Sequence, residues 1–367
     1  MSVQVSYKKQ FLLFLMGILI ILAVIEISAQ FYEYTFVECF FLNSDATDHI
    51  DRDLREKICE QSEFVKIIEY PVYQYEPNQS LDTININSFG FRGEEFNQIK
   101  DSETYRIFLV GGSTAFGAGA TSDNTTIPAY LEEKFLENNY DVEVINAGAG
   151  GSNSIEEVYK IRHLYKMYNP DLFIIYDGWN DSFTHLSSDE LNPDISRVGL
   201  LETEKSSFQL WISKNLELYR TLYVLYPLFS HYSIASSLNN EVYEKNSEIW
   251  NNRWSEICEE NNEDGIQTII LLQPVVGTGN KILSNDEKVH SNYIKAIKTR
   301  EQLDFYSKVL PIESCTASFD LRNAFDNIER PVYYDGGHMN DFGNNIIADK
   351  IFENILPIIL ENYRTTE

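Results

Sequence analysis

Four short apolar runs are spaced along the chain, each bounded by glycine or polar residues. They lie at residues 107–110, 142–145, 172–176 and 268–272. Their length and β-branched content are typical of strands that are buried on both faces. Between the first three runs, residues 127–135 and 154–168 carry apolar positions at helical spacing. Strands that alternate with helices predict a parallel sheet covered on both faces, so we predict a three-layer α/β/α fold.

The amino-terminal segment differs from these runs because it is one long apolar stretch. Residues 11–25 are uncharged and strongly apolar, and residues 27–29 can extend them to membrane-spanning length past Glu26. Lys8 and Lys9 precede this segment and acidic residues follow it, so the positive-inside rule predicts a cytoplasmic tail and an extracytoplasmic remainder. A cleaved signal peptide is the alternative. Residues 27–29 are a poor cleavage site, which favours an uncleaved transmembrane anchor within residues 1–30.

Two other segments lack the regular alternation. Residues 31–104 carry few long periodic runs, and we interpret them as an extracytoplasmic stalk or collar. Residues 182–264 contain an aromatic-rich run and a helical stretch near residues 241–260, and insertions of this length often form lids or caps in α/β enzymes. We therefore predict an α/β domain over residues 105–367 that carries a helical insertion at about residues 182–264.

Charge and ligand-forming residues exclude several functional classes. The 367-residue chain has a formal net charge of −27, and the absence of a basic patch argues against nucleic-acid binding. The six histidines have no cysteine or carboxylate partners at metal-ligand spacing, apart from the aspartate that precedes His338 by three residues. We expect neither a metal nor another cofactor.

The four cysteines, Cys39, Cys59, Cys258 and Cys315, all follow the apolar segment and show no C-x-x-C spacing. In an oxidising compartment they can form two disulfides, most simply Cys39–Cys59 and Cys258–Cys315. Four cysteines allow three pairings, and free buried thiols are the alternative.

Glycine-rich or polar loops follow three of the predicted strands. The first holds Ser113 directly after Gly111-Gly112, and the others are NAGAGGSNS at residues 146–154 and DGWND at residues 177–181. The carboxyl ends of parallel strands meet at one edge of the sheet, where ligands bind. A serine held there in a glycine-rich turn is a candidate nucleophile, although many folds carry such turns without chemistry. Near the carboxyl end, Asp335 precedes His338 by three residues.

These four motifs, in this order, resemble the four sequence blocks of the SGNH (GDSL-like) hydrolase family. The matching elements are a GGST loop, an N-x-G-x-x-G-x-N loop, G-x-N-D and a late D-x-x-H. The resemblance covers residues 105 to the end, apart from the insertion, and implies an SGNH or flavodoxin-like α/β/α fold. The frequent G-D-S of the family is Gly111-Gly112-Ser113 here, as in membrane-anchored branches associated with surface polysaccharides. GFRG at residues 90–93 resembles an element that precedes the first block in such branches, where its role is structural.

The resemblance implies a role for each matched residue. Ser113 corresponds to the nucleophile, His338 to its base and Asp335 to the third member of a triad. The backbone N–H groups of Ser113 and Gly151 and the side-chain amide of Asn180 correspond to the oxyanion hole. The chemistry agrees, because a serine hydroxyl needs an adjacent base and an imidazole, with a pKa of about 6.5, supplies one.

Taken singly, some of these residues have simpler interpretations. Asn180 fits a helix cap and Gly151 a turn. We assign Asp181 and Asp341 to caps or turns, and Trp179 either lines the pocket or packs.

The expected activity is hydrolysis of acyl esters, chiefly acetyl esters on cell-surface glycans, by a membrane-anchored extracytoplasmic enzyme. An O-acyltransferase that passes the acyl group to a sugar hydroxyl would use the same triad. A non-catalytic glycan-binding or scaffold protein is a third hypothesis, which the intact set of motif residues disfavours. The expected partners are an acylated glycan or another small ester, and the membrane.

Overall fold

The structure, a computed structural model, describes residues 6–36, 39–61, 64–68, 72–183 and 239–365. Most of the predicted insertion, residues 184–238, lies outside the described residues. The chain divides into two compact units, one that contains the helix α1 (Tyr7–Phe36) and one that runs from Phe40 and contains the central sheet.

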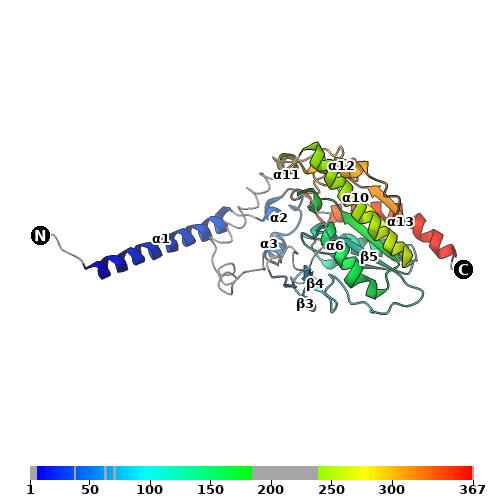
Figure 1. The fold of residues 1–367 in the computed structure, drawn as a ribbon, viewed down its shortest axis with the longest axis horizontal. Helices are drawn as coiled ribbons and strands as arrows, with labels where there is room; N and C mark the ends of the chain where they lie inside the picture. The colour runs from blue at the N-terminus through cyan, green and yellow to red at the C-terminus, as the bar shows by residue number, and fades with distance from the viewer. Residues whose placement is uncertain (1–5, 37–38, 62–63, 69–71, 184–238, 366–367) are drawn as a thin grey trace. The chain divides into compact units, whose positions relative to one another are not determined.

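The central sheet has five parallel strands in the order β6-β5-β7-β8-β9. Figure 1 labels β5, the first of these strands along the chain. Their bounds are β5 Tyr105–Gly111, β6 Val142–Gly148, β7 Leu172–Asp177, β8 Gln267–Leu272 and β9 Ala317–Asp320. Numbered along the chain, this is the order 2-1-3-4-5 of doubly wound folds, in which the order reverses between β5 and β7. The four predicted strands are confirmed, because their apolar runs are buried on both faces.

Helices cover both faces of the sheet, which confirms the predicted three-layer α/β/α fold. One set consists of α5 (Ile127–Glu137) and α13 (Asp341–Thr365), which pack against each other. The other set consists of α6 (Ser154–Lys160), α10 (Asn240–Glu263) and α12 (Thr299–Lys308), with α11 (Asn285–Ala296) against α12. Short helical turns complete these layers: α4 Ser113–Phe116, η1 Asp123–Thr125, η2 Ile161–Tyr165, η3 Lys166–Tyr168 and η4 Asn180–Phe183.

The part of the predicted collar from Phe40 onward belongs to the same compact unit as the sheet. It forms two short helices and two small antiparallel hairpins: α2 Phe40–Asn43, α3 Arg52–Gln61, β1 Ile67–Ile68, β2 Gln74–Tyr75, β3 Gln79–Ser80 and β4 Asn85–Ile86. Phe41 packs edge-on against Tyr334, and the Asn340 amide donates to the carbonyl of Ala46 at 2.6 Å. These residues therefore contact the loop that carries the predicted triad acid and base.

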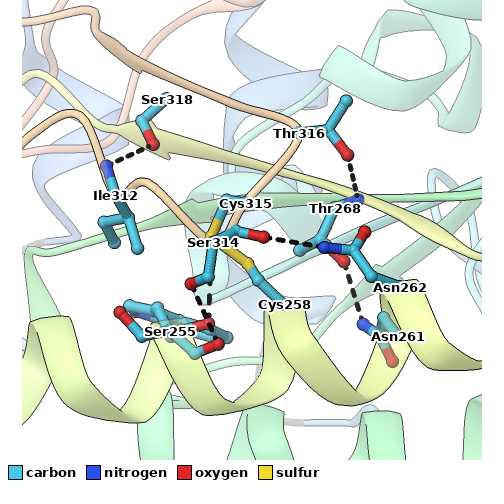
Figure 2. The surroundings of a disulfide bond; sticks show 11 residues. Ser255, Cys258, Asn261, Asn262, Thr268, Ile312, Ser314, Cys315, Thr316 and Ser318 are labelled. Carbon is cyan, nitrogen blue, oxygen red and sulfur yellow. Dashed lines mark hydrogen bonds between the residues drawn. A yellow bond between two sulfur atoms is a disulfide. The ribbon is translucent and has the colours of Figure 1, made fainter.

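A disulfide joins Cys258 on α10 to Cys315, which lies two residues before β9 (Figure 2). This confirms the predicted Cys258–Cys315 pair, and Cys39 and Cys59 are also disulfide-bonded. Around the sulfur atoms, Asn262 donates to the carbonyl of Ser314 at 2.8 Å. The disulfide and this hydrogen bond attach α10 to the segment that precedes β9, an edge strand of the sheet.

Within α1, the segment Tyr7–Ser28 has a mean hydropathy of 2.8 and is not buried in the protein. By length and composition this segment can cross a membrane. A signal sequence has the same features, so the choice between an anchor and a cleaved leader stays a prediction.

Candidate active site

Ser113 lies where β5 ends and the short helix α4 begins. Gly112 is the residue before the helix, so the N–H of Ser113 is among the first N–H groups, which have no acceptor within a helix. A side chain at Gly112 would displace the Asn180 amide, because a Cβ there would lie 2.4 Å from the Asn180 side-chain nitrogen. The glycine thus lets the chain of Ser113 approach the loop that follows β7.

The structure brings His338 and Asp335 to Ser113. The Ser113 Oγ lies 2.6 Å from His338 Nε2, and His338 Nδ1 lies 2.7 Å from Asp335 Oδ2. A carboxylate only accepts, so the neutral imidazole carries its proton on Nδ1 and accepts the Ser113 hydroxyl at Nε2. The three side chains form one continuous hydrogen-bonded chain, built from segments that are 225 residues apart.

Asp335 is held in its charged form. Burial raises the pKa of its carboxyl group, but the nearby imidazole of His338 and two backbone N–H groups lower it by more, so the pKa lies below its ordinary value. Those N–H groups belong to Gly337 and His338, and they donate to Asp335 Oδ1 at 2.9 and 2.7 Å. The three-residue spacing of Asp335 and His338 therefore makes a turn that aligns the acid with the ring.

Two aromatic rings flank the imidazole of His338. Tyr334 stacks on it with the ring planes 10° apart, and Trp179 meets it edge-on with ring centroids 5.0 Å apart. The Tyr334 hydroxyl donates to the carbonyl of Ala118 at 2.9 Å, which fixes the stacking ring. Of the two interpretations of Trp179, the structure shows packing, against the imidazole of His338. Tyr334 was missed by sequence reasoning, although it directly precedes Asp335.

The three predicted oxyanion residues lie on loops that meet at the carboxyl edge of the sheet. Asn180 begins the turn after β7, and its amide donates to the carbonyl of Ser152 at 2.7 Å. An amide nitrogen has a second N–H, which can point toward a ligand. Gly151 directly precedes Ser152 and has a φ of +70°, a backbone conformation that favours glycine. Asn180 is therefore next to Gly112-Ser113 on one side and to the Gly151 loop on the other.

The Gly151 loop and α4 are both held by residues of the predicted collar. The Tyr75 hydroxyl accepts from the N–H of Gly150 at 3.0 Å, and the Tyr75 ring stacks on Phe116 of α4. The buried Arg92 donates to the carbonyls of Phe116 and Gly117, at 3.2 and 2.7 Å, where α4 ends. A cation at the carbonyl end of a helix stabilises it. Arg92 lies in GFRG, for which a structural role is expected, and in the structure it binds the end of the helix that begins with Ser113.

Two aspartates near the motifs differ from each other. Asp341 starts α13, in agreement with its interpretation as a cap or turn residue, and it accepts from the N–H of Thr121 at 3.0 Å. Asp181 is fully buried and accepts from the N–H and the hydroxyl of Ser154, so its bonds are to a separate loop. Among the described residues, no group of three or more His, Cys, Asp or Glu side chains could hold a metal ion.

No protein-family model and no curated protein matches this chain. Solved structures match it at low identity. The acetyl xylan esterase AlAXEase is 14% identical, with a TM-score of 0.39 over 68% of this chain and 99% of its own. An acetyl xylan esterase from Geobacillus stearothermophilus is 12% identical, with a TM-score of 0.42 over 71% of this chain and 97% of its own. A lipase/acylhydrolase from Enterococcus faecalis is 14% identical, with a TM-score of 0.40 over 68% and 95%. Identities and TM-scores this low transfer no activity to this chain.

Proposed function

We propose that this protein is a serine esterase of the SGNH type that hydrolyses acyl esters, chiefly acetyl esters on cell-surface glycans. The observation that carries the proposal is the hydrogen-bonded chain from Ser113 through His338 to Asp335. It supports nucleophilic catalysis because it joins a hydroxyl, a base and a carboxylate in order. Its place at the carboxyl edge, where the strand order reverses between β5 and β7, is the usual ligand position in open α/β sheets.

In the proposed reaction, Ser113 Oγ attacks the acyl carbon while His338 Nε2 takes the hydroxyl proton. Asp335 keeps the ring oriented and stabilises the imidazolium that forms. Collapse of the tetrahedral intermediate breaks the ester bond, and the leaving alcohol oxygen takes the proton from His338. The acyl group remains on Ser113 until a water molecule, deprotonated by His338, attacks the acyl carbon. The bond from that carbon to Ser113 Oγ then breaks, the serine oxygen takes the proton back from His338, and the carboxylic acid is released.

The negative oxygen of the tetrahedral intermediate needs hydrogen-bond donors. We assign this role to the N–H groups of Ser113 and Gly151 and to the Asn180 amide. This assignment is supported by two contacts of Asn180, one with the carbonyl of Ser152 in the Gly151 loop and one with Gly112 beside Ser113. Loss of one such donor typically costs on the order of 10²–10³ in turnover.

Active-site labelling tests the proposed nucleophile. A serine-directed phosphonate should add its mass to the peptide that contains Ser113, and Ser113→Ala should abolish the addition. Ser307 serves as the matched control, because its exposed hydroxyl donates to the carbonyl of Asp304 and has no other partner within the described part of the chain. Ser307→Ala should label like the parent. Labelling at another serine would contradict the assignment of Ser113.

Product analysis tests the reaction. Acetate release from acetylated surface glycans in water alone is expected for an esterase. Acyl transfer seen only when a sugar acceptor is added would replace hydrolysis by O-acyl transfer at the same serine. Binding of glycan with neither labelling nor turnover would favour the scaffold hypothesis.

The glycan target also requires an extracytoplasmic domain. Lys8 and Lys9 before the apolar segment support that orientation. In intact cells, external protease should digest the domain, whereas digestion only after lysis would contradict the orientation. Release into the medium with Gln30 as the first residue would identify a cleaved signal peptide.

A further inference from the structure

A cluster of buried charged and polar side chains lies behind the loops that carry Gly151 and Asn180. Its members come from the loop after β6, from α6, from the end of β7 and the turn after it, and from α10. They are Ser152, Ser154, Glu157, Lys160, Asp177, Asp181 and Arg253. None of them takes part in the proposed proton transfers. Burying so many ionisable groups is costly unless they are paired, so their retention calls for a role.

The first connection runs from Asp181 to Ser154. The Asp181 carboxylate accepts from the Ser154 N–H at 2.9 Å and from the Ser154 hydroxyl at 2.5 Å. Arg253 on α10 donates to the same hydroxyl at 2.5 Å. Ser154 and Asp181 are both fully buried. The turn after β7 is therefore bound directly to the start of α6.

The second connection uses the neighbouring residue of each loop. The Asn180 amide donates to the Ser152 carbonyl at 2.7 Å, and the buried Lys160 donates to the Ser152 hydroxyl at 3.1 Å. Asn180 thus binds Ser152, and Asp181 next to it binds Ser154. Gly151 directly precedes Ser152, so these contacts hold the residue next to it in the chain.

Asp177 is the last residue of β7 and lies close to Asp181 along the chain. Trp250 Nε1 donates to Asp177 at 2.9 Å. Burial, and next the nearby charge of Asp181, raise the pKa of the Asp177 carboxyl well above its ordinary value. Asp177 is therefore a second buried carboxyl group beside the contact of Asp181 with Ser154.

We infer that Asp181 is a positioning residue for the proposed ester hydrolysis, which this inference takes as its premise. By binding Ser154, Asp181 holds the Gly151 loop against the Asn180 turn, and so fixes the separation of two oxyanion donors. Preorganised donors lower the barrier because they need not reorganise as charge develops. Asp181 itself touches neither the nucleophile nor the substrate carbonyl.

The test uses Asp181→Asn, which keeps the side-chain volume but replaces one of the two oxygens that accept from Ser154 by a donor. Turnover of an aryl acetate should fall about 10- to 100-fold with KM changed less than about threefold. In an Asn180→Ala background, the same substitution should cost less than about threefold more, because one of the two donors whose separation Asp181 fixes is already gone. Fully additive losses would overturn the inference, since they mean that Asp181 acts apart from Asn180.

Asp171→Asn is the matched control, at the opposite end of the same strand. Asp171 accepts from the Arg106 N–H at 2.7 Å and pairs with Lys100 just before β7 begins. It resembles Asp181 in binding both a backbone N–H and a second donor. We expect its substitution to leave kcat per folded molecule within about twofold of the parent, because nothing that it holds lies at the carboxyl edge. An equal loss of kcat in both variants would overturn the inference by showing a general loss of rigidity.

Hydrogen–deuterium exchange provides a readout that needs no substrate. Asp181→Asn should speed exchange in peptides that cover residues 146–160, and Asp171→Asn should leave those peptides unchanged. Unchanged exchange there in Asp181→Asn would overturn the inference even if the parent is an active esterase. Faster exchange in a protein whose parent shows neither labelling nor turnover would instead overturn the proposed function, and with it the catalytic role of this contact.

Discussion

At the amino end of the central sheet, a buried guanidinium has its hydrogen bonds directed entirely into the protein. Arg106 at the start of β5 donates to Glu143 and to the carbonyls of Asn97, Gln98 and Tyr168, at 2.6 to 3.1 Å. At the carboxyl end of the same strand, Ser113 donates to His338, whose partner Asp335 is held by N–H groups of its own turn. Both ends bury polar groups and satisfy them.

The two ends of β5 differ in the surroundings of their buried polar side chains. Arg106 binds fixed carbonyls and a carboxylate, so its position has one stable state and its contribution is to the free energy of unfolding. Ser113 and Asn180 instead follow the carboxyl ends of β5 and β7, the edge at which open α/β sheets bind ligands. The comparison teaches that buried polarity by itself does not identify a site, and that its place in the sheet has to be considered as well.

The largest expected effect is at the carboxyl end. Ser113→Ala removes the attacking oxygen and should lower kcat on the order of 10⁶-fold, with the free energy of unfolding changed by less than about 1 kcal/mol. His338→Ala should do the same, and the double variant should cost little more. Aryl acetate kinetics and urea unfolding measure the two quantities. Full activity in Ser113→Ala would falsify the division of the sheet into a reactive and a structural end.

A smaller loss is expected when the orienting acid is changed. Asp335→Asn keeps the shape of the turn but lets an amide donate to His338 Nδ1, which favours the wrong tautomer, so kcat should fall roughly 10²- to 10⁴-fold. Asp320→Asn is the control, because Asp320 accepts from an N–H two residues on, that of Arg322, and lies at the end of β9. If both variants lost activity equally, the role of Asp335 would be structural only.

At the amino end, the loss should be in stability and not in kcat. Arg106→Ala removes four hydrogen bonds and leaves three carbonyls to find new donors, so the free energy of unfolding should fall by about 3 kcal/mol. Arg52→Ala, which breaks an exposed pair with Glu56, should cost less than about 0.5 kcal/mol. Urea unfolding measures the free energy of unfolding, and kinetics on the same samples measure kcat. A large fall in kcat per folded Arg106→Ala molecule would show that the two ends are coupled.

The smallest effect tests the cost of burial beside the site. Neither carboxyl oxygen of Glu157 has a hydrogen-bond partner among the described residues, and burial, followed by the charges of Asp177 and Asp181, raises its pKa well above 4.5. Because the pKa of Glu157 is higher in the native state than in the unfolded state, the native state binds more protons at pH values above about 4.5. The stability that Glu157 contributes in its protonated form is therefore lost as pH rises toward the native-state pKa.

Glu157→Gln should therefore gain stability relative to the parent as pH rises above about 4.5, by no more than about 1.4 kcal/mol per pH unit. Urea unfolding at several pH values measures this difference. Glu353→Gln, at an exposed pair with Lys350, should show no such trend. A difference that shrinks with rising pH would contradict the raised pKa of Glu157.

Much of the fold was predictable from local sequence. The runs that became β5, β6, β7 and β8 are mostly apolar because both faces of those strands are covered, and Glu143 and Thr268 are the polar exceptions. The strand β9 was not predicted, because its four residues Ala-Ser-Phe-Asp are only partly buried at the edge of the sheet and show no such run. The packing of Phe41 and Tyr75 against the site was also missed, since residues 31–104 lack a periodic pattern.

The candidate site divides in the same way. Ser113, Gly151, Asn180, Asp335 and His338 could be named from the sequence, because their short motifs follow strand ends and parallel strands bring those ends together. The approach of Ser113 to His338 and the environment of Asp181 belong to the tertiary structure. Asp181 has the sequence features of a turn residue, and only the packing of the turn after β7 on α6 removes it from water and gives it Ser154 as a partner. Local sequence determines where the chain turns, whereas burial, and with it the strength of a charged contact, depends on segments that are distant along the chain.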